Sequence, residues 1–533
     1  MLQGGAQIYE FIFETDVGIR IMQQLKLSDT EKRLQRCAAS GEPLSLLAGV
    51  SDDDDIACAM AWPPERCIRA EVLVSCLLRT QDGPQVGVPI FRLSGARITG
   101  RLVLTGANIN RHFTLDQCYL EEVPDISEAR TRSIQIVKSY MPGLNARHVN
   151  IDGQFDLTNT IVTGRLRLVN AHVTGELVMN GSKFLNPDDW TLFAGGITVD
   201  GGFFGRHGFE SKGAIRLVGA RLNGGIFLDH ANLMASEFGA LVADNMKVEG
   251  RMICDGLVVD GAVRMPGCRI NGQLSWDGAI IRASDSGLDC RRLVAEEFIL
   301  TPAEPIDGSV DLGGAHVSVF CDDPKTWPTD LRLDGFAYGS LIARSRRSGP
   351  DRPPDRYLAD SSNTSAEILP ARERLRWLRL TATGYRPQPY EQLAQFYRSV
   401  GHDDEARKVL LAKQRNRRST QTIAGKLWGY LLDWSVGYGY RPWLAALWLI
   451  ALVTAGTIVF SWKPPSALDP RTAPEFDPFV YTINLLLPIG QFIQPNQWNP
   501  VGAERWFVYA LVGTGWLLAT AAIAGITRVL NRS

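Results

Sequence analysis

Seven aspartates in the central part of the chain are the residues best suited to chemistry: Asp152, Asp156, Asp200, Asp229, Asp255, Asp260 and Asp277. Carboxylates that lie together on one face act as general acid and base in enzymes that cleave polysaccharides. Aspartate is also common in turns, because its short side chain tolerates turn geometry. We favour the turn role, and the sequence therefore assigns no catalytic residue.

Six arginines form the second candidate set: Arg101, Arg165, Arg167, Arg216, Arg251 and Arg264. Each lies at an outward position of an expected strand, so together they would form a basic stripe that binds an acidic partner or lipid headgroups. The alternative, which we favour, is that they only keep a sheet face soluble. A net charge of −1 also argues against a nucleic-acid-binding protein, which would be strongly basic.

The histidines and cysteines lack the spacing of metal or nucleophilic sites. The seven histidines show no H-x-x-x-H pattern, and the nine cysteines contain no C-x-x-C. Their odd number and scatter indicate reduced, structural thiols. Phosphate-binding glycine loops and a nucleophile elbow are also missing. The sequence thus predicts no cofactor, no cofactor-binding residue and no metal ligand, and it leaves enzymatic activity open while favouring its absence.

A glycine that returns every eleven residues reveals the element that carries these side chains. The clearest runs are Gly153, Gly164, Gly175 and Gly250, Gly261, Gly272, each glycine followed by apolar residues at +2 and +4. Alternation of period two predicts short strands, and two such units make a coil of about 22 residues. We expect a mainly β fold, a parallel β-helix or solenoid over residues 89–337, with glycines in its turns.

Residues 1–88 are expected to form a helical cap that shields the first coil. Pro64–Arg79 places Ile68 and later apolar residues at helical spacing, which predicts a helix. The run Asp52–Asp55 predicts a solvated loop or a helix start rather than a metal site. Met1–Asp16 has no basic stretch followed by an apolar one, so it is not a signal peptide and we expect the soluble part in the cytoplasm.

Helical segments follow the repeat. The composition of residues 338–370 is typical of a linker. Residues 371–440 are expected to contain a helical hairpin, since Tyr390–Val400 and Glu405–Arg417 each place apolar residues on one face. A membrane-proximal helix over Lys426–Tyr440 completes this part.

Two uncharged runs in residues 441–533 predict a two-helix transmembrane region with an external loop. Pro442–Trp462 and Trp506–Ile526 each have the length needed to cross a hydrocarbon core. Residues 407–441 hold eight Lys or Arg and one acid, whereas the loop 463–505 holds three basic residues and four acids. This asymmetry predicts a multi-pass protein of the inner (plasma) membrane with both termini cytoplasmic.

The external loop contains one more apolar segment, Pro478–Ile493, which is too short to span and suggests a re-entrant or interfacial segment. Two spans with a re-entrant segment between them make the minimal pore unit of tetrameric cation channels. Leu485–Gly490 differs from the Thr-Val-Gly-Tyr-Gly filter of such channels. A channel subunit, which would need a homo-oligomer, stays open beside a simple anchor hairpin.

The repeat Gly95-Ala96-Arg97-Ile98-Thr99-Gly100 and its later copies resemble the pentapeptide-repeat-like β-solenoid membrane proteins of actinobacteria. The tail carries the same resemblance, through the helix pair Tyr390–Gln414, Gly437-Tyr438-Gly439-Tyr440-Arg441-Pro442, and Leu486-Leu487-Pro488 before the last span. For some members the resemblance implies a membrane-associated oxidoreductase with a nicotinamide, flavin or haem site, but no residue here matches such a site. Strict pentapeptide repeats advance by five residues and this chain by eleven, so we expect a flatter or irregular coil.

These observations predict a non-enzymatic, membrane-anchored β-solenoid that acts as a binding or scaffolding protein at the cytoplasmic face of the membrane. Its expected partners are the lipid bilayer and a protein on the solenoid face, with a homo-oligomer left open and nucleic acid excluded. Two alternatives remain. One is a two-span ion-channel-like subunit with a cytoplasmic solenoid sensor, and the other is the membrane-associated oxidoreductase that the resemblance alone implies.

Overall fold

The computed structural model describes residues 26–49, 53–78, 90–344, 368–380, 384–423, 425–426, 430, 442–468, 475–486 and 498–530. The chain divides into two compact units. The first comprises residues 1–369 and 379–382, and the second comprises residues 370–378 and 383–533. Each unit is described by itself.

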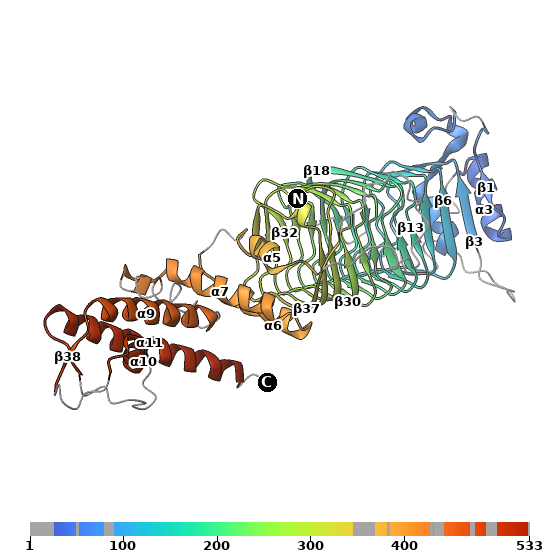
Figure 1. The fold of residues 1–533 in the computed structure, drawn as a ribbon. Coiled ribbons are helices and arrows are strands. Elements are labelled where there is room, and N and C mark those ends of the chain that lie inside the picture. Colours follow the sequence, from blue (N-terminus) through green and yellow to red (C-terminus); the bar gives the residue numbers. More distant parts are fainter. Residues whose placement is uncertain are drawn as a thin grey trace, which may run out of the picture. The chain divides into compact units, whose positions relative to one another are not determined.

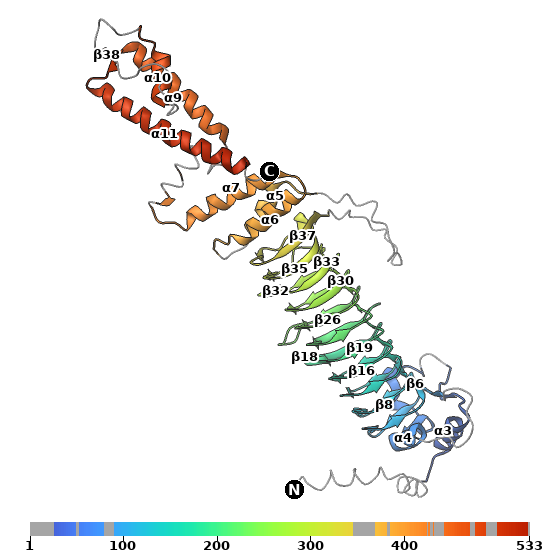
Figure 2. The same ribbon diagram turned by 90° about the horizontal axis from the view of Figure 1, so that it is seen from below.

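The first unit is a parallel β-solenoid of about 12 turns, as the sequence repeat predicts (Figures 1 and 2). One coil contains β12 (Asn150–Ile151), β13 (Phe155–Asp156), β14 (Ile161–Val162) and β15 (Leu166–Arg167), and β16 (His172–Val173) begins the next coil in register on β12. Strands therefore begin at alternating steps of five and six residues, which together make the eleven-residue beat. This coil has four short strands, so the expectation of a flatter coil is not met here.

A flatter coil does occur toward the end of the solenoid. There, one long strand takes the place of two short strands of an earlier coil. For example, β30 (Arg269–Ser275) pairs with both β26 (Lys247–Val248) and β27 (Met252–Ile253). The long strands that follow in this sheet are β33 (Val294–Leu300), β35 (His316–Asp322) and β37 (Ala337–Ala343).

The apolar residues of the repeat fill the inside of the coils, as predicted. Phe155, Leu166, Leu177, Met252 and Trp276 are each 0% exposed. Fully burying a side chain of this size contributes roughly 1.5–3 kcal/mol. Because every coil contributes several such residues and contacts only its neighbours, stability accumulates along the stack.

The glycines of the beat do not mainly serve as turn residues. Gly175, Gly201, Gly224 and Gly272 belong to one column of glycines, in which Gly250 lies between Gly224 and Gly272. A Cβ added to any of these four would come within 2.8 Å of a backbone atom of the preceding coil. Glycine is therefore required there by the close approach of two backbones. The left-handed turns lie at other positions, where Asn159 (φ 55°) takes the same role as Gly181 (φ 65°).

In the part of the N-terminal cap that the structure describes, the α-helices are α3 (Asp29–Ser40) and α4 (Ala70–Leu78). Ser28 and Glu31 form a reciprocal capping box that begins α3. The predicted helix over Pro64–Arg79 is wrong in its first half, because Cys67–Arg69 forms strand β2 and pairs with β4 (Arg97–Thr99). Ile68 is thus drawn into the first coil.

The run Asp52–Asp55 contains a helix start, one of its two predicted roles, because Asp55 is the N-cap of the 3-10 helix η1 (Ile56–Ala61) and its side chain accepts from the Ala57 N–H. The other role, a solvated loop, is wrong at Asp54, which is 8% exposed. Its carboxylate accepts hydrogen bonds from the backbone N–H groups of Ala48 and Gly49, both at 2.9 Å. It also pairs with Arg66 at 2.9 Å, and the Arg66 guanidinium donates to the Gly95 carbonyl at 2.8 Å. Asp54 therefore ties the cap to the first coil.

The second unit is helical. It begins with α5 (Ala371–Leu378), and the predicted hairpin is confirmed as α6 (Gln388–Ser399) and α7 (Asp403–Ser419), which pack against each other. Glu405 of α7 accepts a hydrogen bond from the Ala371 N–H at 2.7 Å and so fixes α5.

Later in the unit, the described residues form α9 (Pro442–Trp462), α10 (Pro478–Leu486) and α11 (Ala503–Leu530). Phe460, Tyr481, Leu486, Val508 and Leu511 form their shared apolar core. Glycines allow close packing, since a Cβ on Gly456 would lie 2.4 Å from Thr482 and one on Gly515 would lie 2.4 Å from the Leu486 carbonyl.

The two predicted transmembrane helices are not supported by this part of the structure. Among the residues described, no helix combines the length and the apolar character needed to cross a membrane. Both uncharged runs are helical, but the side chains of 442–443 and 445 in the first and of 519 and 521–526 in the second lie outside the described residues. The structure describes only residues 426 and 430 of the predicted membrane-proximal helix. It also does not describe residues 487–493 of the predicted re-entrant segment.

Candidate functional site

Several enlarged coils interrupt the regular repeat of the solenoid, and two of them lie on either side of one coil. A further one, in which Arg269 pairs with Val294, lies later in the chain. Asn150 pairs with His172, a step of two eleven-residue units and so the regular coil length. The step from His172 to its partner Thr198 is longer, and so is the step from Arg221 to its partner Lys247. Insertions in a solenoid commonly lie on the face that binds a partner.

Both insertions lie beside the same strand, β21 (Glu210–Arg216). Residues 186–189 bulge from β18 (Lys183–Phe193) where its pairing with β21 shifts register. Residues 235–240 form a tight turn before β25 (Leu241–Val242), which pairs with β21 from the other side. The two enlarged coils therefore flank the coil to which β21 belongs.

A glycine beneath the first insertion lets it lie across β21. A Cβ on Gly213 would come within 2.2 Å of the Asn186 carbonyl oxygen and 2.8 Å of the Asp189 carbonyl oxygen. The next residue, Ala214, is small and fully buried. The bulge can therefore reach over this coil toward the second insertion.

The insertions bring aromatic rings together. Trp190 and Phe238, which come from different coils, stack with ring centroids 4.7 Å apart and planes 13° from parallel. Trp190 also meets Phe193 edge to face at 5.8 Å. Phe238 is 43% exposed, so the cluster presents apolar surface to its surroundings. Aromatic side chains in such a setting are enriched where proteins bind one another.

Arg216 lies on this aromatic platform. Its guanidinium carbon is 5.2 Å from the Phe193 ring centroid and 5.9 Å from that of Trp190, within the range of cation–π attraction. The Nε–H of Arg216 is buried and has no hydrogen-bond acceptor among the described residues, and no described carboxylate pairs with its charge. We call Trp190, Phe193, Arg216 and Phe238 the insertion patch.

A second arginine beside the patch is neutralised. Arg165 forms an ion pair with Asp189 and also lies 5.7 Å from the Phe193 ring centroid. Burial acts to raise the pKa of Asp189, but the hydrogen bonds from Arg165 and the Trp190 N–H, together with the charges of Arg165 and Arg167, hold that pKa below its ordinary value. Asp189 is therefore ionised at neutral pH, and Arg216 is left as the unneutralised cation of the patch.

The candidate aspartates divide into two groups. Four serve turns or contacts between side chains on the surface. Asp156 accepts from the Thr158 N–H in a turn (2.9 Å), Asp152 pairs with Arg132, Asp200 binds His172 (2.9 Å), and Asp260 lies 3.8 Å from Arg282. These contacts agree with the turn and surface roles that the sequence favours.

The other three aspartates form a row on successive coils. Asp229, Asp255 and Asp277 occupy equivalent positions on three successive coils. Their register follows from the adjacent strands, in which Phe227 pairs with Ile253 and Ile253 pairs with Ser275. Burial, with the charges of Asp277 and Asp229, raises the pKa of Asp255 against the effect of its hydrogen bond from Ser275. Across the described residues, no group of three or more His, Cys, Asp or Glu side chains is placed to hold a metal ion.

Three of the six arginines in the candidate basic stripe are paired with acids. Arg101 binds Asp125 at 3.1 Å and Arg264 binds Asp244 at 2.8 Å, beside the Arg165–Asp189 pair. Arg167 and Arg251 are exposed. Of the six arginines, Arg165 and Arg216 lie over aromatic rings, and Arg216 differs from Arg165 in having no paired carboxylate among the described residues.

The cysteines are buried inside or near the coils rather than gathered at a surface. All nine are free thiols, and six are buried: Cys76, Cys118, Cys254, Cys268, Cys290 and Cys321. Burial raises the pKa of Cys118 and that of Cys268 to about 12. Such thiols stay protonated and are poor nucleophiles.

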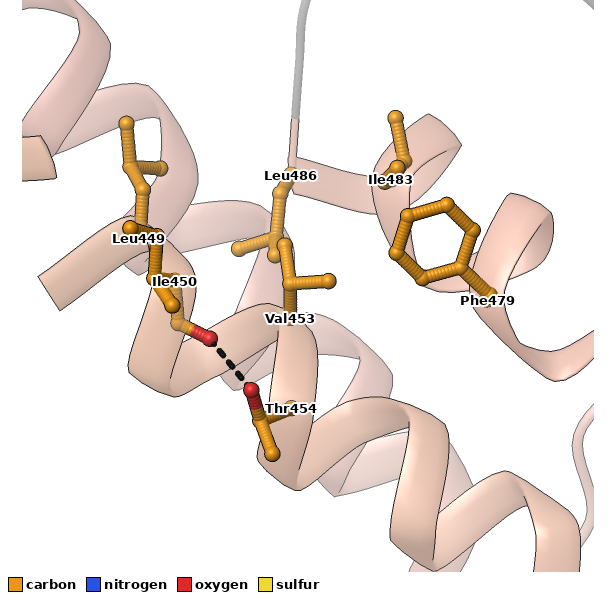
Figure 3. Close-up of a pocket in the computed structure, with 7 residues that line it drawn as sticks. All are labelled: Leu449, Ile450, Val453, Thr454, Phe479, Ile483 and Leu486. Atoms are coloured by element: carbon orange, nitrogen blue, oxygen red, sulfur yellow. Dashed lines mark hydrogen bonds between the residues drawn. The ribbon is translucent and has the colours of Figure 1, made fainter. Parts of the chain in front are cut away.

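The second unit carries an apolar groove between α9 and α10 (Figure 3). It is lined by Leu449, Ile450, Val453, Thr454, Phe479, Ile483 and Leu486. The Thr454 hydroxyl donates to the Ile450 carbonyl at 2.8 Å, so the polar atom of the lining is already satisfied. The groove offers contact to hydrocarbon but no chemistry.

The aromatic members of the patch were not predicted from the sequence. Arg216 was placed among the outward arginines, whereas Trp190, Phe193 and Phe238 were assigned no role. Coil length was the signal that would have found them, because two lengthened coils with a shorter one between them can place their insertions on neighbouring surface. No protein-family model, curated protein or solved structure matches this chain.

Proposed function

We propose that this chain is a non-enzymatic scaffolding protein. Its solenoid binds a protein partner through the insertion patch, and its helical unit attaches it to the cytoplasmic face of the inner membrane. The observation that carries the proposal is the joining of two separate insertions into one exposed aromatic cluster. A regular coil contributes only to the stability of the stack, whereas the insertions add exposed apolar surface without changing the core.

The rigidity of the solenoid supports a binding role. Trp190 and Phe193 extend from a strand, and Gly213 and Ala214 beneath them leave no space for collapse. A preorganised aromatic surface loses little conformational entropy when a partner binds. The described residues around the patch are held in place by packing and by ion pairs, so a binding partner would meet a fixed surface.

Exposed apolar side chains on the helical unit support membrane attachment. On α9, α10 and α11 the large exposed ones are Leu447, Ile450, Ile458, Val459, Trp462, Phe479, Trp506, Tyr509, Trp516 and Leu517. Trp462 is 84% exposed and Trp506 is 75% exposed. Surface of this kind is unfavourable in water by about 25 cal/mol per Å² and favourable against lipid. Attachment of this kind does not require any one described helix to cross the bilayer.

The basic residues favour the cytoplasmic side. Residues 407–441 hold eight Lys or Arg against one acid, and this stretch precedes α9. The cytoplasmic leaflet carries anionic lipid, which attracts cations close to the surface. The solenoid would then lie in the cytoplasm.

Membrane attachment is tested by fractionation of cells that express the full chain. We expect the protein in the membrane pellet after alkaline extraction, and partial release when Ile450→Lys and Leu517→Lys are combined. Val294→Lys is the control, since Val294 is a 44% exposed residue of β33 in the solenoid. Wild-type protein found wholly in the supernatant would exclude attachment.

Partner binding is tested by replacing Phe238 with a photo-crosslinking phenylalanine analogue in cells. We expect a discrete crosslinked product after irradiation. The matched control is the same analogue at Val294, whose exposure is nearly equal to that of Phe238 (44% against 43%). Equal products from both positions, or none from position 238, would refute the scaffolding proposal.

A further inference from the structure

We infer that the insertion patch recognises a peptide segment that presents one carboxylate next to an aromatic or aliphatic side chain, with Arg216 as the residue that binds the carboxylate. This inference rests on the proposed function and adds the chemistry of the partner. It follows from the charge of Arg216, the rings beside it and the acids around it.

Arg216 is prepared to bind an anion. Its Nε–H has no acceptor among the described residues, and its guanidinium is held over Phe193 and Trp190 at 5.2 and 5.9 Å. A planar guanidinium that is already oriented donates two parallel hydrogen bonds to a carboxylate with little further loss of entropy.

The aromatic rings define what must lie beside the carboxylate. Phe238 is 43% exposed and stacks on Trp190, so the outer face of this pair is open to an apolar group. An apolar side chain of the partner placed there would remove both surfaces from water. The combination of charge and ring within one patch therefore selects a short motif and not an isolated anion.

The surrounding charges argue against a nucleic acid or another polyanion. Asp188 and Glu237 are exposed at the tips of the two insertions, and Asp189 faces Arg165 and Arg167. The described carboxylates thus offset the charges of Arg165 and Arg167 and leave the Arg216 guanidinium without a paired acid. A chain of regularly spaced phosphates gains its affinity from many unpaired cations, whereas a single carboxylate needs only one.

The test uses the full chain in lipid nanodiscs as bait for a phage-displayed library of random heptapeptides. We expect enrichment of peptides that place Asp, Glu or a free C-terminus next to Phe, Tyr, Trp, Leu or Ile. Selected peptides are then synthesised and their affinities measured by fluorescence anisotropy at several salt concentrations. Because the contact is charged, we expect affinity to fall as salt rises.

Matched variants separate the role of Arg216 from general charge. Arg216→Gln should weaken binding roughly ten- to a hundredfold, the loss expected for a charged hydrogen bond. Arg251→Gln removes the same charge at an exposed position outside the patch and should leave affinity unchanged. Circular dichroism of both variants verifies that the coils are intact. Arg216→Lys should bind with intermediate affinity, since it keeps the charge and loses the planar fork.

Several outcomes would overturn the inference. These are no enrichment, enrichment of neutral or basic peptides, equal affinity of wild type and Arg216→Gln, or tighter binding of a dodecamer of deoxythymidine than of any selected peptide. The scaffolding proposal fails separately. A crosslink at position 238 without acidic peptides would remove only the chemistry assigned here, whereas acidic peptides that bind without a crosslink in cells would remove the scaffolding role.

Discussion

Gly224→Ala should destabilise the solenoid more than any ordinary surface substitution. The added Cβ would lie 1.4 Å from the carbonyl oxygen of Gly201 and 2.2 Å from its carbonyl carbon, both backbone atoms of the preceding coil. No side-chain rotation relieves such a contact, so the two coils must separate. Separation weakens the inter-coil hydrogen bonds from Asn223 to Val199 (2.9 Å) and from Phe203 to Gly225 (3.0 Å).

The expected cost is roughly 3–5 kcal/mol, from overpacking of about 1–3 kcal/mol and about 1 kcal/mol for each weakened hydrogen bond. Gly219→Ala is the matched control on the neighbouring turn. Gly219 has φ 67° and nothing within 4 Å of an added Cβ, so only left-handed strain of roughly 1–2 kcal/mol applies. Gly219→Asn should cost less still, because Asn tolerates this conformation and already occupies it at Asn170 and Asn245.

Urea unfolding followed by circular dichroism measures the total change, and hydrogen exchange with mass spectrometry locates it. We expect faster exchange in the coils on both sides of Gly224 and near-native exchange in distant coils, because a solenoid is coupled mainly between neighbours. A Gly224→Ala protein within about 1 kcal/mol of wild type would refute the close-approach argument. So would a Gly219→Ala protein that is the less stable of the two.

Further outcomes are expected from single residues. Gly213→Val should displace the bulge at Asn186 and separate the stacked rings, so crosslinking at position 238 should drop while far-UV circular dichroism stays unchanged; an unchanged crosslink would contradict the packing. Iodoacetamide at pH 8 should modify the exposed Cys58 quickly and Cys268 only after unfolding, since burial raises the pKa of Cys268 to about 12; equal rates by peptide mass spectrometry would contradict its burial. Burial also raises the pKa of Asp255 above its ordinary value of 3.8, so the folded state holds this proton more tightly than the unfolded state. Stability is therefore lost as pH rises from the pKa of the unfolded state through that of the folded state. Asp255→Asn should therefore make urea midpoints at pH 4 and pH 7 more alike, and an unchanged difference would show that this carboxyl does not titrate as described.

Parts of the fold follow directly from local pattern. The alternation around Phe155 and Leu157 and its return eleven residues later predict strands, inward residues and stacking, because side-chain direction along a strand has a period of two. The helix pair α6 and α7 was predictable for the same reason, from apolar residues on one helical face. The first half of the segment Pro64–Arg79 was not, since pairing of Cys67–Arg69 with β4 outweighed its helical spacing.

The structural role of the repeated glycines could not be predicted from the local sequence pattern. Sequence alone established that a glycine recurs, and it suggested a turn, which is the commonest local reason for one. The structure shows that Gly175, Gly201, Gly224 and Gly272 lie above one another where backbones approach too closely for a Cβ. Left-handed turns at neighbouring positions accept Asn or His as well as glycine, for example Asn159 and His207.

The sequence by itself determined the solenoid, its inward residues and the helical segments that follow, because each depends on contacts between residues close in sequence or on a strict period. The tertiary structure alone decided the site. Trp190 and Phe238 meet only because two insertions are brought to the same face by the stacking of the coils between them. Arg216 differs from the other outward arginines because it lies over those rings without a paired acid. No local pattern carries that distinction, because it depends on which coil lies above which.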